Sequence, residues 1–229
     1  TFWKKETEYE VYNNPWNEIT LTDYESHMSL ASIMQLQALN KLIEGQLKAW
    51  PVSSTMILGI AGGNGLEHIR ASGIKKVYGV DINAAYLSET SVRYQDLGNI
   101  LELLCIDLHK CSGKLPGAEL LIANLLVEYI GCGCFQQVVQ QVEPKYVSCV
   151  IQVNTGVSWV SDSPYRHVFD GLKQVYHQID ADMLRESMSG IGYRYIGALE
   201  YPLPNGKKLV RLDFKKGSMD MLLPDSTAG

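Results

Sequence analysis

The stretch ILGIAGGNGLEHI, residues 57–69, joins an apolar β-type run to a glycine-rich turn and a helix-compatible segment. The apolar run at residues 56–58 fits a strand that is buried on both faces. Gly62, Gly63 and Gly65 allow the chain to turn sharply and to approach a ligand closely, because they lack a Cβ atom. A helix that begins under a ligand also offers it unpaired N–H groups. The stretch therefore predicts the binding edge for a nucleotide-like cofactor.

Strand-like runs alternate with helical stretches through the middle of the chain. Helices are expected at residues 84–97, where Asn83 can cap the first turn, and at residues 135–142, before Pro144. This alternation predicts βαβ units with a parallel sheet. The five apolar runs cover residues 56–60, 76–80, 101–106, 119–124 and 146–153.

The end of the chain has a different pattern. Two strand-like runs, at residues 193–201 and 208–214, are joined by the turn sequence PLPNG. This pattern predicts an antiparallel pair that closes the sheet. Residues 217–229 show no clear period and are expected to form a flexible tail.

The N-terminal fifty residues are expected to form an arm followed by a helical lid. Residues 1–20 are aromatic and polar, and Pro15 and Trp16 argue against regular structure there. Thr22 and Glu25 have the spacing of a capping box. Apolar residues then recur at helical intervals, which predicts one long amphipathic helix that runs to about Lys48. They are Ile33, Leu36, Leu39, Ile43 and Leu47.

Composition limits the classes of function. The chain has 229 residues, 46% of them hydrophobic, and a formal net charge of −5. Its lysines and arginines are scattered, which argues against a nucleic-acid partner. No apolar run approaches the length of a membrane span, and the N-terminus lacks the apolar core of a signal peptide, so we expect no membrane partner and a cytoplasmic location. The five cysteines are expected to be reduced, and Cys132 and Cys134 lack a second pair at zinc-site spacing, so no metal is expected.

Two aspartates extend the glycine-rich turn into a larger site. Asp81 ends the second apolar run about 20 residues after Ala61, where a carboxylate can accept hydrogen bonds from the two ribose hydroxyls. Asp107 ends the third run and can accept a hydrogen bond from an adenine amino group. Either residue alone would be explained as a turn or helix cap. Their positions at successive strand ends favour a nucleoside site instead.

With these motifs, the chain resembles the class I S-adenosylmethionine-dependent methyltransferases over residues 52–216. The resemblance rests on ILGIAGGNGLEHI, VYGVDIN, LLCIDLHK and AELLIANLLVEYIG, and on the closing hairpin. It implies an α/β fold: a Rossmann-like three-layer sandwich with a seven-stranded, mostly parallel sheet whose strand 7 is antiparallel, plus the N-terminal helical cap. Residues 51–216 would form the domain that binds S-adenosyl-L-methionine.

The resemblance also implies roles for individual residues. The methionine and ribose portions of the donor would lie against the first motif, the ribose hydroxyls on Asp81, and the adenine between the second and third motifs. Gly59 replaces the acidic residue that usually begins the first motif, and Ala61 replaces its first glycine. The implied cofactor-binding residues are Ile60, Ala61, Gly63, Gly65, Asp81, Ile82, Asp107, Leu108 and Asn124.

Methyl transfer from an activated sulfonium needs an in-line nucleophile, exclusion of water and sometimes a base. Tyr24 and His27 are candidates to orient or deprotonate an acceptor near the donor methyl group. Glu128 is a candidate base or acceptor anchor, although a carboxylate near a helix start is also stabilised there without a function. The acceptor wall is expected to combine residues 124–129 with the loop after the fifth strand. The loop candidates are Asn154, Trp159, Tyr165, Arg166 and His167.

Three other functions compete with this interpretation. A nicotinamide dehydrogenase would need G-x-G-x-x-G, and His68 stands at its last position. A nucleobase amino-methyltransferase would show two prolines after Asn124, where this chain has two leucines. A non-catalytic cofactor-binding protein is compatible with the missing acidic residue at Gly59. We predict a methyltransferase acting on a small-molecule acceptor, with a protein side chain as the second candidate acceptor and no prediction of oligomeric state.

Overall fold

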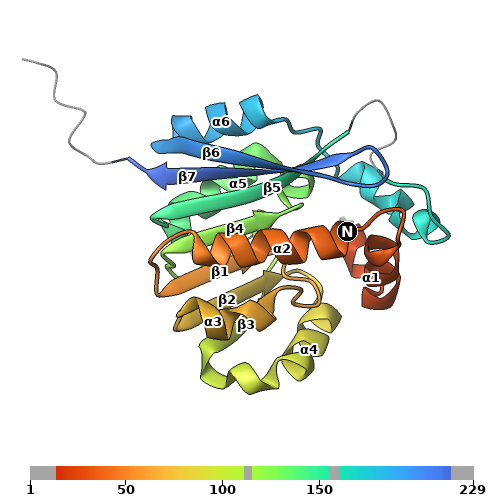
Figure 1. The fold of residues 1–229 in the computed structure, drawn as a ribbon, viewed down its shortest axis with the longest axis horizontal. Coiled ribbons are helices and arrows are strands. Elements are labelled where there is room, and N and C mark those ends of the chain that lie inside the picture. Colours follow the sequence, from red (N-terminus) through yellow and green to blue (C-terminus); the bar gives the residue numbers. More distant parts are fainter. Residues whose placement is uncertain (1–13, 111–114, 155–159, 218–229) are drawn as a thin grey trace, which may run out of the picture.

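The structure is a computed structural model that describes residues 14–110, 115–154 and 160–217. Its centre is a seven-stranded sheet in the order β3-β2-β1-β4-β5-β7-β6 (Figure 1). The first five strands are parallel, and β7 is antiparallel to both of its neighbours. The strands are β1 (Ser54–Leu58), β2 (Lys76–Asp81), β3 (Leu101–Cys105), β4 (Leu120–Asn124), β5 (Tyr146–Val153), β6 (Tyr193–Pro202) and β7 (Lys208–Lys216). The predicted mixed sheet and its closing hairpin are confirmed.

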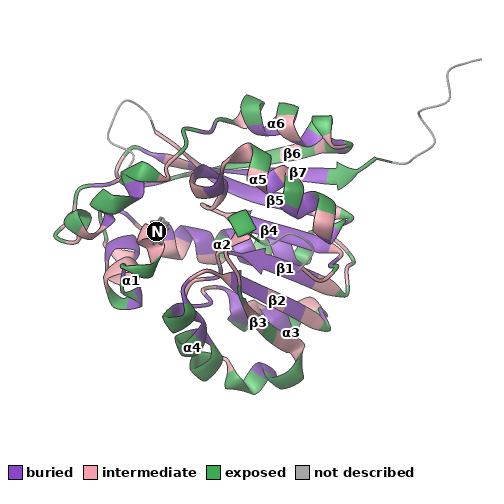
Figure 2. Ribbon diagram, turned by 180° about the vertical axis from the view of Figure 1, so that it is seen from behind, coloured by how far each residue is buried: buried purple, intermediate pink, exposed green. Residues whose placement is uncertain are grey.

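Helices cover both faces of the sheet and produce three layers. One face packs against α2 (Gln35–Lys48), α3 (Ile69–Ser72) and α4 (Ala84–Arg93), and the other packs against α5 (Val127–Val142) and α6 (Ala181–Gly190). In Figure 1, α2 crosses in front of the sheet, whereas Figure 2 shows α5 on the opposite side. The predicted Rossmann-like three-layer arrangement is confirmed.

Alternating side chains of the central strands produce two separate cores. On β1, Ile57 faces the α2 side, whereas Met56 and Leu58 face the α5 side. Strand β4 repeats this alternation, as expected for a sheet covered on both faces. In Figure 2 the central strands are buried and exposed residues concentrate on the outer surfaces of the helices. The carboxyl ends of β1 to β4 therefore meet at one edge of a rigid sheet.

The prediction of one long N-terminal helix is wrong, because the structure has two separate helices there. Helix α1 (Leu21–Ser29) ends before a short connection, and α2 begins after Met34, which has a left-handed backbone with φ of 56°. The N-cap of α1 is Thr20 instead of Thr22, and its hydroxyl accepts a hydrogen bond from the N–H of Asp23 at 3.1 Å. Because of the break, α1 closes over the carboxyl edge of the sheet while α2 lies on its face (Figure 1).

Other helix boundaries also differ from the prediction. Helix α4 ends at Arg93, and a 3-10 segment continues to Ile100. Helix α5 begins at Val127, eight residues before the predicted start, and has a non-helical backbone at Gly131. Helix α6 was not predicted. The 3-10 segments are η1 (Pro15–Asn17), η2 (Leu66–His68), η3 (Gln95–Ile100), η4 (Leu108–Lys110) and η5 (Arg166–Gln174).

Candidate functional site

The glycine-rich turn after β1 has an irregular backbone held by hydrogen bonds. Gly59 has φ of 65° and Ala61 has φ of 48°, so a non-glycine residue adopts the left-handed region here. The N–H groups of Gly59 and Ile60 both donate to the carbonyl of Val80, at 2.8 and 3.1 Å. The Ala61 carbonyl accepts from the Thr90 hydroxyl at 2.7 Å. These contacts fix the turn against β2 and α4.

Asp81, at the end of β2, completes the turn. Its Oδ2 accepts from the Ala61 N–H and its Oδ1 from the Asn83 N–H, both at 2.9 Å. Burial raises the pKa of this carboxyl group, while the backbone hydrogen bonds oppose that shift. Each carboxylate oxygen can accept more than one hydrogen bond, so both retain capacity for ligand hydroxyl groups.

A cavity of about 730 Å³, including its opening to solvent, lies at this edge of the sheet; we call it the strand-edge cavity. Six of the nine predicted cofactor-binding residues line it, together with Gly59, Ile106 and several aromatic side chains. The six are Ala61, Asp81, Ile82, Asp107, Leu108 and Asn124.

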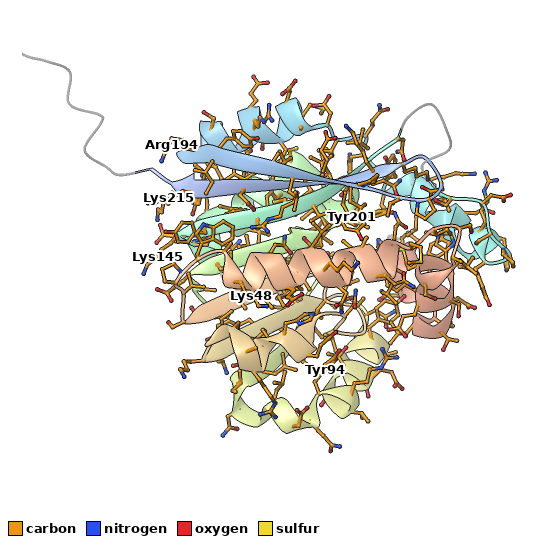
Figure 3. All side chains as sticks on the ribbon, in the orientation of Figure 1. Lys48, Tyr94, Lys145, Arg194, Tyr201 and Lys215 are labelled. Atoms are coloured by element: carbon orange, nitrogen blue, oxygen red, sulfur yellow. The ribbon has the colours of Figure 1, made fainter. Side chains whose placement is uncertain are left out.

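The other three predicted residues are not in the lining of the strand-edge cavity. A Cβ atom at Gly63 would lie 2.7 Å from the Tyr94 ring, and one at Gly65 would collide with Ile43 of α2. These two glycines are needed for helix packing around the turn. Figure 3 shows Tyr94 below α2 in this view, in the region of α4. Ile60 instead lines a separate small cavity.

This smaller space, the glycine-loop cavity, lies between the glycine turn and the N-terminal helices. It shares Tyr24, Gly59, Ala61 and Asn124 with the strand-edge cavity. Glu25 of α1 is the acidic side chain among its lining residues and pairs with Arg93 of α4, with Oε2 and Nη2 separated by 2.9 Å. The sequence analysis did not identify Glu25 as a site residue.

Gly59 cannot readily carry the acidic side chain that the resemblance leads one to expect. Its φ of +65° disfavours any side chain, and a Cβ atom would lie 3.2 Å from the Leu126 side chain. The backbone geometry and this contact explain why the position is glycine. Any acidic partner for a ligand in the glycine-loop cavity has to come from elsewhere, and Glu25 is in place.

The Asn124 side chain, at the end of β4, is held by a reciprocal amide pair. Gln46 of α2 donates from Nε2 to Asn124 Oδ1 and accepts at Oε1 from Asn124 Nδ2, each at 2.9 Å. Gln46 is fully buried and also donates to the Ser148 hydroxyl at 2.9 Å. Asn124 therefore forms a fixed part of both cavity walls.

A second large space of about 560 Å³ adjoins the strand-edge cavity, and we call it the aromatic cavity. Trp16, Tyr24, Leu125 and Tyr129 line both spaces. Leu125 has φ of 53°, a strained backbone that turns the chain from β4 into α5. The other residues that line the aromatic cavity are His27, Met28, Gln35, Glu128, Gln152, Val160, Ser161, Phe169 and Tyr176.

Glu128 is the buried carboxyl group of the aromatic cavity, with only 3% of the residue exposed. Its Oε1 accepts from the Gln152 N–H at 2.8 Å, whereas its buried Oε2 finds no hydrogen-bond partner among the described residues. Burial raises the pKa of Glu128 to about 7, although the hydrogen bond from Gln152 opposes the shift. A carboxyl group with this pKa can exchange a proton near neutral pH.

Tyr24 lines all three cavities, whereas His27 lines the aromatic cavity. Burial, reinforced by the charges of Asp81 and Glu25, raises the pKa of Tyr24, so its hydroxyl stays protonated at neutral pH. Burial also lowers the pKa of His27 to about 4, with a further contribution from Lys207. His27 is therefore neutral and a weak base, with Nδ1 2.7 Å from the Ser163 hydroxyl.

Of the residues predicted for an acceptor wall, Leu125, Glu128 and Tyr129 line the aromatic cavity, whereas the described ones after β5 do not. Asn154 and Tyr165 lie outside the cavity lining, and Arg166 and His167 are exposed. Trp159 lies outside the described residues. The segment after β5 instead lines the cavity through Val160, Ser161, Phe169 and Tyr176. These positions follow no period in the sequence, so only the folded chain brings them together.

The described part of the chain gives no sign of a metal site or a membrane span. No group of three or more His, Cys, Asp or Glu side chains within it could hold a metal ion. None of its helices is both long enough and apolar enough to cross a bilayer. Its four cysteines, at positions 105, 132, 134 and 149, are free thiols.

Comparison with known proteins identifies the fold. Neither models of known protein families nor curated protein sequences match this chain. Solved structures do match, and many of them are S-adenosylmethionine-dependent methyltransferases. The chain has the fold of the class I methyltransferases.

Three of these structures illustrate the likeness. N-methyltransferase NodS from Bradyrhizobium japonicum WM9, in complex with S-adenosyl-L-homocysteine, has a TM-score of 0.63 and 10% identity, covering 88% of this chain and all of that one. Magnesium protoporphyrin IX methyltransferase (ChlM) from Synechocystis PCC 6803 has a TM-score of 0.57 and 12% identity, covering 86% of each chain. The [4+2]-cyclase SpnF has a TM-score of 0.60 and 9% identity, covering 81% and 83%.

Proposed function

We propose that this chain transfers a methyl group from S-adenosyl-L-methionine, bound in the strand-edge cavity, to a small molecule bound in the aromatic cavity. The observation that carries the proposal is the shared wall of Trp16, Tyr24, Leu125 and Tyr129. Because these four residues line both cavities, a donor and an acceptor bound in them would be immediate neighbours. Such an arrangement holds two reactants in position and excludes water, which is the main requirement of methyl transfer.

The strand-edge cavity fits the nucleoside part of the donor. The Asp81 carboxylate offers acceptor capacity for the ribose hydroxyls, while Ile82, Ile106 and Leu108 provide apolar surfaces for the adenine ring. Asp107 lines the same cavity and can accept from the adenine amino group. When bound, the donor supplies a methyl group already activated on a sulfonium centre.

The glycine-loop cavity fits the methionine part of the donor. It opens from the turn at Gly59 and Ala61, and Glu25 supplies a carboxylate that Gly59 lacks. The Arg93 guanidinium beside Glu25 can meet the donor carboxylate, because arginine pairs well with planar anions. The N-terminal helix thus replaces an interaction that the resemblance places on β1.

The chain's own groups supply orientation and proton transfer on the acceptor side. Tyr24 stays protonated and can orient either ligand, whereas Glu128 is the titratable side chain suited to accept a proton near neutral pH. His27 is too weakly basic for that task at neutral pH. We therefore assign proton acceptance to Glu128 and positioning to Tyr24.

Calorimetric titration of the full chain tests the donor site directly. S-adenosyl-L-methionine and its demethylated product should both bind with measurable heat. The presence of S-adenosyl-L-homocysteine in the NodS and ChlM crystals supports this expectation. Failure of both ligands to bind at millimolar concentration would exclude the proposed function.

An Asp81→Ala variant tests the position of the donor. Loss of the ribose hydrogen bonds should weaken binding of S-adenosyl-L-homocysteine by about 1–3 kcal/mol. Asp162→Ala is the matched control, because the Asp162 side chain is 94% exposed and lines neither the strand-edge cavity nor the aromatic cavity. Calorimetry gives the affinities, and circular dichroism confirms that each variant is folded. Equal affinity of a folded Asp81→Ala variant would mean that the donor binds elsewhere.

A further inference from the structure

The aromatic cavity combines one carboxylate with a surface of aromatic rings. Glu128 is the formally charged side chain among its described lining residues, since His27 is neutral. Its Oε2 is buried without a hydrogen-bond partner in the described part of the chain. A buried carboxylate oxygen without a donor is costly, so an occupant that carries a hydrogen-bond donor accounts for it.

The rings beside Glu128 meet at steep angles. Trp16 and Tyr129 lie 4.9 Å apart with an interplanar angle of 88°, and Trp16 and Tyr24 lie 6.1 Å apart at 74°. Tyr129 and Tyr176 follow at 6.0 Å and 64°. These rings all line the aromatic cavity, and an aromatic face carries the negative part of the ring quadrupole. Such an arrangement attracts cations, ammonium groups in particular.

We propose that the acceptor is a small amine, which binds as an ammonium ion between these rings and the Glu128 carboxylate. The inference rests on the proposed methyl transfer and names the substrate class of the same site. A neutral alcohol could donate a hydrogen bond to Oε2, but it would leave the carboxylate charge uncompensated and would gain little from the ring faces. An ammonium ion both compensates the carboxylate charge and interacts favourably with the ring faces. Its carbon skeleton would contact Met28, Val160 and Phe169.

The same carboxylate can remove the proton that an ammonium ion must lose before it can accept a methyl group. Bound as a cation, the amine has no lone pair, so one proton must first pass from nitrogen to Glu128 Oε2. The neutral nitrogen then forms the new N–C bond while the S–C bond breaks, and the bonding pair stays on sulfur, which becomes a neutral thioether. The product leaves as an N-methylammonium ion, and Glu128 returns its proton to solvent. A proton acceptor whose pKa lies near the working pH is suited to this cycle.

Paired probes test the inference by binding, without turnover. The full chain, saturated with S-adenosyl-L-homocysteine, is titrated by calorimetry at pH 8 with benzylamine and with benzyl alcohol, which have similar size and shape. We expect the amine to bind at least about tenfold more tightly, because a charge-assisted hydrogen bond and a cation–π contact act together. Glu128→Gln should abolish this preference. Glu143→Gln, at the C-cap of the same helix with a side chain 71% exposed, should retain it.

A second variant separates the rings from the carboxylate. Tyr176→Leu removes a ring that lines the aromatic cavity but not the strand-edge cavity. The variant should weaken the affinity for benzylamine by about threefold and leave the affinity for S-adenosyl-L-homocysteine unchanged.

The possible outcomes separate the two proposals. Binding of S-adenosyl-L-homocysteine without an amine preference, or a preference that persists in Glu128→Gln, would overturn the amine assignment and leave methyl transfer in place. An amine preference lost in Glu128→Gln and reduced in Tyr176→Leu would support the assignment. Absence of S-adenosyl-L-homocysteine binding would overturn the proposed function and the amine assignment with it.

Discussion

The two large cavities have different origins. The strand-edge cavity is formed mainly by residues that follow β1, β2, β3 and β4, four neighbouring parallel strands whose ends must meet at one edge. The aromatic cavity draws on residues 16–35, 125–129 and 152–176, which only tertiary packing brings together. A parallel sheet of this order provides the first cavity wherever it forms. The second depends on individual side chains, so we expect acceptor choice to vary without change of fold.

The largest effect is expected at Gly65, where a substitution tests whether glycine is required for packing against α2. In Gly65→Ala, the new methyl group would collide with Ile43 and the residue would have to keep φ of +96°. Strain of about 1–2 kcal/mol and overpacking of about 1–3 kcal/mol should together lower the free energy of unfolding by about 4 kcal/mol. Urea denaturation measures this change.

Gly73→Ala provides a matched control for that variant. Gly73 also has positive φ, +80°, but a Cβ atom there would meet nothing within 4 Å. It should show the backbone strain alone. In an Ile43→Ala background, Gly65→Ala should likewise cost only the strain, because the colliding atoms are gone. Equal destabilisation by Gly65→Ala and Gly73→Ala would show that contact with α2 does not explain the glycine at position 65.

On the acceptor side, the charge of Glu128 should make stability depend on pH. Its pKa rises on folding from 4.5 to about 7, so the unfolded chain ionises first as pH increases. The contribution of Glu128 to the free energy of unfolding should therefore fall between about pH 4.5 and 7 and then level off, with a total loss on the order of 3 kcal/mol. The lowered pKa of His27 gives the opposite trend over a similar range, but it does so in wild type and Glu128→Gln alike, so the difference between the two proteins isolates Glu128. Glu128→Gln lacks this loss, so its free energy of unfolding should exceed that of the wild type at pH 8 but not at pH 4.5.

Neighbouring groups should not produce the same dependence. The titratable groups that face Glu128 are Tyr129 and Cys132 on α5, Cys149 on β5, and Tyr176, and burial raises the pKa of each of them above its ordinary value. They stay neutral over this range. Urea denaturation of wild type, Glu128→Gln and the exposed control Glu143→Gln at both pH values makes the comparison. A constant difference between wild type and Glu128→Gln would contradict the raised pKa.

The smallest expected effect concerns Ala61. Its left-handed backbone is relieved in Ala61→Gly, which should stabilise the fold, but glycine also gains freedom in the unfolded chain. The two effects nearly cancel, so the free energy of unfolding should change by less than about 1 kcal/mol. Affinity for S-adenosyl-L-homocysteine should stay within about threefold, measured by calorimetry. A larger loss of affinity would show that the Ala61 methyl group contacts the donor.

Most of the sheet could be predicted from the sequence because its signals are local. Apolar runs mark the strands, and glycine or aspartate marks their ends, as at Gly59 and Asp81. The break between α1 and α2 had no such signal, since helical periodicity continues through Ile33 and Leu36. Met34 takes a left-handed backbone without being glycine or asparagine, so tertiary packing overrides the local preference.

The part of the site that is formed by the ends of the strands could be predicted from the sequence. Asp81 and Asp107 follow strands, and their meeting at one cavity is a consequence of parallel order. Gly65 looked like a ligand contact because the glycine pattern does not reveal that Ile43 fills the space. Glu128 could be selected as a candidate, but its burial and unpaired oxygen depend on the chain after β5, which has no repeating pattern.

The reciprocal amide pair between Gln46 and Asn124 has a consequence for how this chain can vary. Each amide supplies both the donor and the acceptor that the other needs, across 78 positions of sequence. Replacing Asn124 with an apolar residue leaves the buried Oε1 of Gln46 unmatched, and replacing Gln46 leaves both amide atoms of Asn124 without this partner, whereas replacing both removes the mismatch between them. In sequences related to this one, positions 46 and 124 should therefore covary: a change at one should be accompanied by a change at the other.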